Sequence, residues 1–194
     1  MGTTSSQAGR PALRAVTDPG EDHVVLLGDD GAAVGLAARA GVHGTVTPLH
    51  LGFSCYVYDE DGRVLLTRRA LGKATWPGVW TNSFCGHPRL HESLPDAVAR
   101  HAWHELGMTL TDVRCVLPDF RYRAVDPSGI VEHEVCPVYT ARALTGPVPH
   151  PEEVMDLTWV TPATLRWLAR ETPWALSPWT VLQVGAADRT AGAR

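Results

Sequence analysis

Hydrophobic and polar positions alternate in several short runs of the chain, which predicts β-strands joined by tight turns. Two strand–turn–strand patterns come first. HVVLL and AAVGL flank the turn GDDG from His23 onward, and GFSCYVY and RVLLTRR flank residues 59–62. Turn residues between short hydrophobic runs are typical of β-hairpins. Further strands are expected at 113–117, 130–142 and 154–160.

The run SLPDAVARHAWHELG, residues 93–107, has a helical pattern instead. Ser93 followed three residues later by Asp96 fits a capping box, and Gly107 fits a left-handed helix end. The hydrophobic row of this helix consists of Val98, Ala102 and Leu106. Two more helices are expected, at 161–171 and 177–187.

Strands and helices therefore mix without regular βαβ alternation. This pattern predicts fold class α+β, a mixed β-sheet sandwich flanked by helices. Residues 1–20 are small, polar and rich in Gly and Pro, and such a segment cannot bury enough apolar surface to offset its ordering entropy. We expect a flexible N-terminal tail over 1–20 and a single domain over 21–190.

Composition and charge narrow the function classes. A chain of 194 residues is long enough to bury a continuous core. Its net charge of -4 at pH 7, with acids and bases mixed, gives no basic stripe for nucleic acid. No apolar run reaches signal-peptide length or the roughly 20 residues of a membrane span. We expect a cytoplasmic protein that binds neither nucleic acid nor membrane.

The cysteines are spread evenly through a domain that does not need cross-links, so free thiols are expected. They are Cys55, Cys85, Cys115 and Cys136. Cys85 lies in TNSFCGHPR, two residues before His87. From the spacing alone, it is half of a disulfide, a metal ligand shared with His87, a buried small hydrophobe or a proton donor.

The segment GIVEHEVCPVY, residues 129–139, is interpreted as one strand. Alternation places Glu132 and Glu134 on one face with Ile130, while His133 points the other way. Two carboxylates on an apolar face repel each other and lose hydration unless a cation lies between them. A metal ion is the simplest such cation. An exposed edge strand with solvated glutamates is the alternative.

Three histidines complete a candidate metal site. His43 and His50 flank GTVTPL, whose Gly44 and Pro48 permit a bend, and His87 follows the CGH turn. Three imidazoles and two carboxylates suit Mn²⁺, Zn²⁺ or Mg²⁺ better than copper. Each histidine alone is more often a structural or surface residue than a metal ligand, so only the whole set indicates a metal.

The predicted helix fits part of the Nudix signature of diphosphate-cleaving enzymes, G-x5-E-x7-R-E-U-x-E-E-x-G-U with U aliphatic. The frame positions fall on Gly86, Glu92, Arg100, Gly107 and Met108. Of three helix carboxylates only Glu105 remains, because His101 and His104 replace the others. Hydrolysis with Mg²⁺ needs a cluster of acidic oxygens, so hydrolysis is disfavoured. One diphosphate-bound Mg²⁺ on Glu105 remains compatible with the sequence.

Four stretches together carry a family resemblance. They are TPLHLGFSCYVYDEDGRVLLTRRALGKATWPGVWTNSFCGHP, HAWHELGM, PDFRYRAVDPSGIVEHEVCPVY and TPWALSPW. In these motifs the chain resembles type I isopentenyl diphosphate isomerase, a Nudix-fold enzyme of isoprenoid biosynthesis, from about His23 to Gln183. A Nudix-type diphosphate hydrolase is the alternative.

The resemblance implies isomerisation of isopentenyl diphosphate to dimethylallyl diphosphate through a tertiary carbocation. This chemistry needs an acid and a base on opposite faces of the alkene and a pocket without water. By resemblance, Cys85 and Glu134 are that pair, and Tyr122 supports the carboxylate side. Trp179 lies beside the carbocation, where an aromatic face contributes about 2 kcal/mol or more when dry.

The resemblance also implies two metal ions. The tightly bound ion, Mn²⁺, Zn²⁺ or Mg²⁺, is expected to be bound by His43, His50, His87, Glu132 and Glu134. The second, Mg²⁺, bridges the diphosphate to Glu105 and to the backbone carbonyl of Cys85.

The resemblance also implies that basic side chains bind the diphosphate. Arg69 and Lys73 correspond to contacts of the family, and Arg39 is a further candidate. His101 stands where the family often has an arginine, and we expect it to contact the substrate as well. The expected partner is thus a small-molecule diphosphate, and the expected state is a monomer or weak homodimer.

Overall fold

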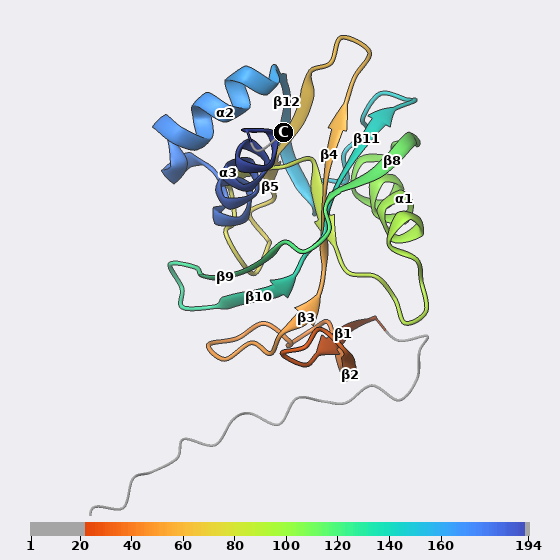
Figure 1. Cartoon of the computed structure of the whole chain (residues 1–194), viewed down its shortest axis with the longest axis vertical. Helices are drawn as coiled ribbons and strands as arrows, with labels where there is room; N and C mark the ends of the chain where they lie inside the picture. Colours follow the sequence, from red (N-terminus) through yellow and green to blue (C-terminus); the bar gives the residue numbers. More distant parts are fainter. Residues whose placement is uncertain (1–21, 193–194) are drawn as a thin grey trace, which may run out of the picture.

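The computed structural model describes residues 22–192, so the tail expected over 1–20 lies outside the described residues. The described strands form two sheets (Figure 1). The smaller sheet has the order β2-β1-β3-β10-β9. Its strands are β1 (His23–Leu27), β2 (Ala33–Ala38), β3 (His50–Leu51), β9 (Arg121–Val125) and β10 (Val131–Val135).

The larger sheet has seven strands along the path β12-β5-β4-β11-β8, with β6 paired to β5 and β7 paired to β4. These strands are β4 (Phe53–Tyr58), β5 (Val64–Arg69), β6 (Trp80–Thr81), β7 (Phe84–Gly86), β8 (Leu110–Leu117), β11 (Val138–Ala143) and β12 (Val154–Val160). The helices are α1 (Leu94–Leu106), α2 (Pro162–Glu171), the 3₁₀ turn η1 (Pro173–Ala175) and α3 (Pro178–Gly192).

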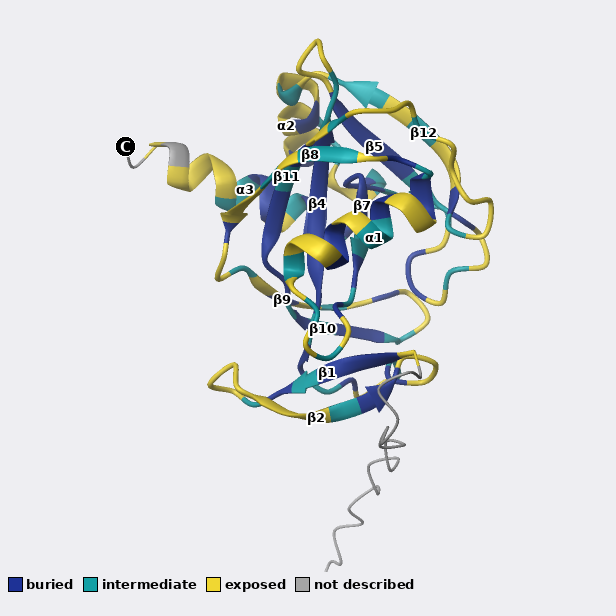
Figure 2. Cartoon of the chain, turned by 90° about the vertical axis from the view of Figure 1, so that its right-hand side faces the viewer, coloured by how far each residue is buried: buried dark blue, intermediate teal, exposed yellow. Residues whose placement is uncertain are grey.

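Helices cover both faces of the larger sheet. Alternate side chains of β4, such as Phe53, pack with the buried row of α1 in one hydrophobic cluster. The intervening ones, such as Tyr56, pack with Leu165 of α2 and Val184 of α3 in another. Figure 2 shows α1 with buried positions against this sheet and exposed positions outside. The predicted α+β class, a mixed β-sheet flanked by helices, is confirmed.

Local signals predicted α1 correctly. The Ser93 hydroxyl accepts a hydrogen bond from the backbone N–H of Asp96, and Gly107 ends the helix with a φ of 59°. Such caps satisfy backbone groups that have no partner within the helix. The predicted hydrophobic row, Val98, Ala102 and Leu106, is fully buried. Both predicted hairpins are also present, as the antiparallel pairs β1–β2 and β4–β5.

The single strand expected over 130–142 is wrong. The chain forms β10, passes Cys136 and Pro137, and continues as β11 in the other sheet. Proline has no N–H to donate to a strand ladder, so continuous pairing ends there. β3 and β4 change sheets in the same way at Gly52, whose N–H donates to the carbonyl of Val135 over 2.9 Å. Two parallel strand pairs therefore cross side by side between the sheets.

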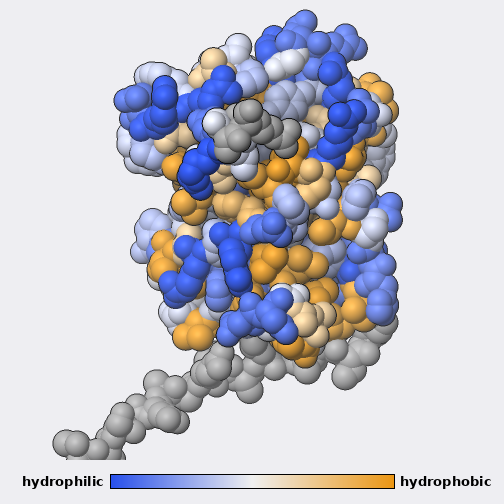
Figure 3. Space-filling view, in the orientation of Figure 1, coloured by the Kyte–Doolittle hydropathy of each residue, from blue (hydrophilic) through white to orange (hydrophobic). Residues whose placement is uncertain are grey.

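Hydrophobic residues on the face shown in Figure 3 lie in groups between hydrophilic ones.

Among residues 22–192, none of the helices combines the length and the hydrophobicity that a membrane crossing requires.

Glu92 and Arg100 tie α1 to the segment before it. The Arg100 guanidinium donates to both Glu92 carboxylate oxygens, over 2.7 and 2.6 Å, and also to the His87 carbonyl over 3.1 Å. The bond from Arg100 lowers the pKa of Glu92 below its usual value, although partial burial opposes the shift. The ion pair therefore stabilises the folded protein fully at pH values above the pKa of Glu92 in the unfolded chain. This stabilisation is lost as pH falls through the lower pKa that Glu92 has in the folded protein.

We predict that Glu92→Gln lowers the free energy of unfolding at pH 7 by about 1.5–3 kcal/mol, as expected for hydrogen bonds to a charged group. Urea unfolding of both proteins at pH 7 and at acidic pH measures the effect. The difference should shrink as pH falls, because the wild-type carboxyl then also becomes neutral. Glu60→Gln, at an exposed turn position, is the control. An equal difference at both pH values would contradict the ion-pair explanation.

Candidate active site and metal centre

A cavity of about 760 Å³ opens where the two sheets meet α1 and α3. Of the predicted site residues, only His50 does not line it, because its side chain is fully buried. The predicted residues that line it are Arg39, His43, Arg69, Lys73, Cys85, His87, His101, Glu105, Tyr122, Glu132, Glu134 and Trp179. The fold thus brings residues from distant parts of the sequence to one cavity.

Four predicted metal ligands lie together. One ligand atom from each of His43, His50, His87 and Glu134 lies within 4.8 Å of all the others. Strand register produces part of this cluster, because β3 and β10 run parallel with His50 opposite Glu134. The Glu134 carboxylate is 3.1 Å from His87 Nε2 and 3.4 Å from His50 Nε2.

The residues of this cluster fit a metal ion. The Nε2 atoms of His43 and His50 are buried and make no hydrogen bond. Buried polar atoms normally have a partner, and a cation would supply one to both nitrogens. Imidazole nitrogens together with a carboxylate form a donor set that suits Zn²⁺ or Mn²⁺.

Glu132 lies at the edge of this cluster and not within it. Its Oε2 is 3.0 Å from His43 Nε2, and its Oε1 accepts a hydrogen bond of 2.7 Å from the Thr75 hydroxyl. Both Glu132 and Glu134 are buried, as the strand alternation predicted, while His133 is only half-buried.

The cluster shifts the pKa values of its members. Burial alone would lower the pKa of His50, but the Glu134 carboxylate outweighs it and raises that pKa. Burial alone would raise the pKa of Glu134, but the neighbouring imidazoles of His50 and His87 outweigh it and hold that pKa far below its usual range. Burial lowers the pKa of His87. An ionised carboxylate and a neutral imidazole are the forms in which these residues bind metals.

Cys85 lies in β7 opposite Ser54 of β4, and its sulfur is 3.2 Å from the Ser54 hydroxyl oxygen. The thiol donates to Asn82 Oδ1 over 3.2 Å. The Asn82 amide is oriented by its Nδ2, which donates to the carbonyls of Cys55 and Phe84. Burial raises the pKa of Cys85 to about 12, so the thiol keeps its proton at neutral pH.

The disulfide reading of Cys85 is wrong, because all four cysteines are free as expected. Its sulfur is also absent from the clustered ligand atoms around His87. Ser54 and Asn82 were not predicted as site residues. The only signal for Ser54 in the sequence is a polar residue within an apolar strand, and Asn82, between β6 and β7, has polar neighbours on both sides and no such signal.

Aromatic rings form one wall of the cavity. The Trp179 ring lies 5.4 Å from Trp76 and 5.9 Å from Tyr122, between ring centroids. Its Nε1 donates to Asn82 Oδ1 over 3.0 Å, which connects this wall to Cys85. Tyr122 lies opposite Glu134 in the pairing of β9 with β10, so the wall reaches the metal cluster as well.

The basic side chains predicted to bind the diphosphate are engaged by acids, carbonyls or rings. Arg39 pairs with Asp22 over 2.6 Å, and Lys73 forms an ion pair with Glu153. Arg69 donates to the Thr75 carbonyl, and its guanidinium carbon lies 5.4 Å from the centre of the Trp179 ring.

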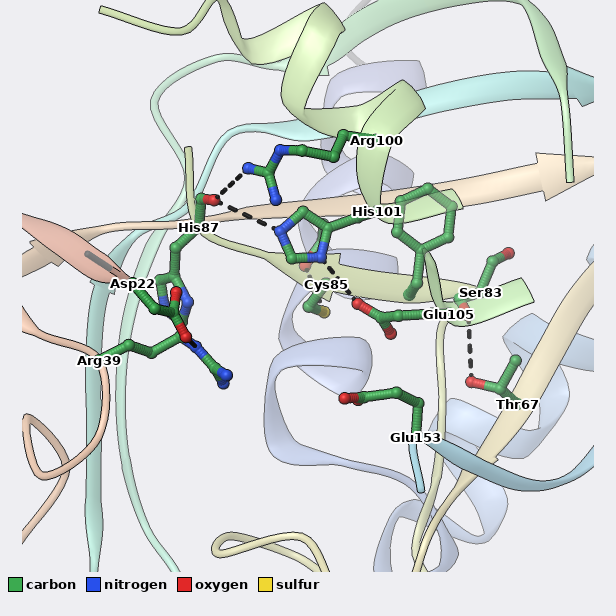
Figure 4. Close-up of polar contacts among 12 residues, drawn as sticks. Asp22, Arg39, Thr67, Ser83, Cys85, His87, Arg100, His101, Glu105 and Glu153 are labelled. Atoms are coloured by element: carbon green, nitrogen blue, oxygen red, sulfur yellow. Dashed lines mark hydrogen bonds and ion pairs between the residues drawn. The ribbon is translucent and has the colours of Figure 1, made fainter. Parts of the chain in front are cut away.

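His101 lies between two groups of the cavity wall (Figure 4). Its Nδ1 is 2.9 Å from Glu105 Oε1, and its Nε2 is 3.4 Å from the His87 carbonyl oxygen. A Cβ at Gly86 would lie 2.5 Å from this ring, so glycine leaves the space that the imidazole occupies. His101 therefore orients the only carboxylate that remains at the signature positions of α1.

Solved structures and sequence families resemble this chain. A crystal structure of a Deinococcus radiodurans protein has a TM-score of 0.64 at 19% identity, covering 86% of this chain and 99% of that protein. A crystal structure of a MutT protein from Methanosarcina mazei has a TM-score of 0.57 at 21% identity, covering 74% and 96%. These similarities show the fold. The NUDIX domain family matches residues 48–180.

Curated relatives match almost the whole chain. The isopentenyl-diphosphate Delta-isomerase of Agromyces mediolanus is 60% identical over 175 residues, which cover 89% of this chain and 85% of the relative. The enzyme of the same name from Leifsonia xyli is 55% identical over 176 residues, covering 90% and 95%. With these relatives and the NUDIX match, the chain belongs to the isopentenyl-diphosphate Delta-isomerase family of NUDIX-domain proteins.

Proposed function

We propose that this chain isomerises isopentenyl diphosphate to dimethylallyl diphosphate. The observation that carries the proposal is that a protonated thiol, Cys85, and an ionised carboxylate, Glu134, line one cavity with aromatic rings. One group of this pair delivers a proton to the terminal alkene carbon. The other accepts a proton from the allylic carbon, and the electrons of that C–H bond form the new double bond. The reaction therefore consumes no net proton.

The aromatic wall suits the intermediate of this reaction. A tertiary carbocation is trapped by water, so its pocket must exclude water. Trp179 and Tyr122 are almost completely buried, and a ring face attracts positive charge through its quadrupole. We infer that Trp179 lies against the carbocation and that Tyr122 supports Glu134 from the neighbouring strand.

The metal cluster supports the same function. His43, His50, His87 and Glu134 would hold Mn²⁺, Zn²⁺ or Mg²⁺, with Glu132 as a fifth ligand. Such an ion, when bound, supplies a fixed positive charge that orients Glu134 and tunes its basicity. Glu105 and the backbone carbonyl of Cys85 would hold the Mg²⁺ that accompanies the diphosphate.

The diphosphate would bind the basic side chains of the cavity. Arg69, Lys73 and Arg39 line it, and the acids that pair with Lys73 and Arg39 neutralise them in the absence of substrate. We infer that the phosphate oxygens replace these acids and that His101 contributes through Glu105. A cytoplasmic location and a monomeric or weakly dimeric state stay predictions from the sequence.

Diphosphate hydrolysis is the weaker alternative. At the signature positions of α1 that carry carboxylates in hydrolases, His101 and His104 leave only Glu105. The curated relatives at 55–60% identity bear the isomerase name, which favours isomerisation as well.

Incubation of the metal-loaded protein with isopentenyl diphosphate and Mg²⁺ in D₂O tests the reaction. We predict dimethylallyl diphosphate that contains deuterium, observed by NMR, because the pair exchanges its protons with solvent. Cys85→Ala and Glu134→Gln should each lower kcat by about 10²- to 10⁴-fold, the usual contribution of an acid–base group. Cys115→Ala, at an exposed cysteine, is the control and should keep full activity. Unchanged substrate, or release of inorganic phosphate, would refute the isomerase assignment.

Gly52→Ala tests the space that Glu134 needs. An added Cβ would lie 2.5 Å from Glu134 Oε2, so the carboxylate must leave its present position beside the histidines. We predict loss of both isomerase activity and bound metal, with metal content measured by mass spectrometry of the purified protein. Gly35→Ala, where the nearest atom is 4.0 Å from the added Cβ, should lose neither. Full metal content in Gly52→Ala would contradict the assignment of Glu134 as a ligand.

A further inference from the structure

Thr75 connects the metal cluster to the basic side of the cavity. It is almost completely buried in the loop between β5 and β6. Its hydroxyl donates to Glu132 Oε1 over 2.7 Å. The Arg69 guanidinium donates to the Thr75 carbonyl over 3.0 and 2.9 Å, and to its hydroxyl oxygen over 3.3 Å.

The direction of these hydrogen bonds follows from the groups themselves. A guanidinium only donates, so the Thr75 oxygen accepts from Arg69. A hydroxyl has a single hydrogen, and here it faces a carboxylate oxygen. The hydrogen therefore goes to Glu132, and the chain of bonds runs from Arg69 through Thr75 to Glu132.

The two oxygens of Glu132 consequently have different surroundings. Oε1 is held by Thr75, whereas Oε2 lies 3.0 Å from His43 Nε2, a buried nitrogen without a hydrogen bond. Only Oε2 faces the cluster of His43, His50, His87 and Glu134. Glu132, at the edge of the cluster, therefore faces it with one carboxylate oxygen and not with both.

We propose that Thr75 is a positioning residue that makes Glu132 a monodentate fifth ligand of the metal. The proposal rests on the metal site of the proposed function. Hydrogen bonds to metal-ligating carboxylates fix their orientation, and their loss typically weakens metal binding by about 10- to 100-fold.

The loop around Thr75 is held by contacts that do not involve its hydroxyl. The N–H of Trp76 is 3.4 Å from Asp126 Oδ2, and the Trp76 ring packs edge-to-face on Trp179. The Thr75 carbonyl keeps its two bonds from Arg69 when the side chain changes. Valine has nearly the shape of threonine, so Thr75→Val removes the hydroxyl and leaves these contacts in place.

The test is titration of metal-free protein with Mn²⁺ in the absence of substrate, with free Mn²⁺ measured by electron paramagnetic resonance. We expect Thr75→Val to weaken Mn²⁺ binding by about 10- to 100-fold. Thr75→Ser retains the hydroxyl and should bind like the wild type. Thr172→Val, which removes a hydroxyl bonded to the Leu168 carbonyl at the end of α2, is the matched control. Circular dichroism verifies folding of each variant.

Wild-type Mn²⁺ affinity in folded Thr75→Val would overturn the proposal. An equal loss in Thr75→Ser and Thr75→Val would overturn it too, because packing and not the hydroxyl would then be responsible. A wild-type chain that binds neither Mn²⁺ nor Zn²⁺ would refute the metal site and with it the role of Thr75. The D₂O turnover assay separates that result from failure of the isomerase function.

Discussion

A carboxylate buried where two sheets meet is the constraint on which the rest of the site depends. Glu134 is only 6% exposed, and an ionised group at that depth needs compensating partners. His50 and His87 provide them, and Gly52 leaves the space for the carboxylate. The unbonded nitrogens of the cluster are then explained by a cation. The parallel pairing of β3 with β10, just before the chain crosses to β4 and β11, places His50 beside Glu134, so fold and site have one origin.

The other polar groups described in the cavity also have partners that compensate their charge or satisfy their hydrogen bonds. Arg39 and Lys73 pair with acids, and His101 pairs with Glu105. The Cys85 thiol is held by Ser54 and Asn82 while burial keeps it protonated. In the proposed function, a bound diphosphate would replace these acids beside the cations, and the aromatic wall around Trp179 would keep water away from the hydrocarbon part of the substrate.

Sequence patterns predicted the elements whose signals are local. Hairpin turns and the caps of α1 depend on neighbouring residues, and these elements formed as expected. The short strands β3, β6, β7 and β9 were not expected, because two to five residues carry too weak a pattern. The break at Pro137 was missed because alternation continues across it, and only pairing partners distant in sequence assign β10 and β11 to different sheets.

The sequence by itself determined which donors the protein has: the histidines, the glutamates, the thiol, and a signature helix that retains only Glu105 of its three carboxylates. These follow from residue types and from spacing along the chain. Only the tertiary structure decided that Glu132 lies at the edge of the cluster, that Thr75 holds one of its oxygens and that Asn82 orients the thiol. The physical reason is that a hydrogen bond depends on distances of about 3 Å between atoms, and most of these contacts join residues far apart in sequence.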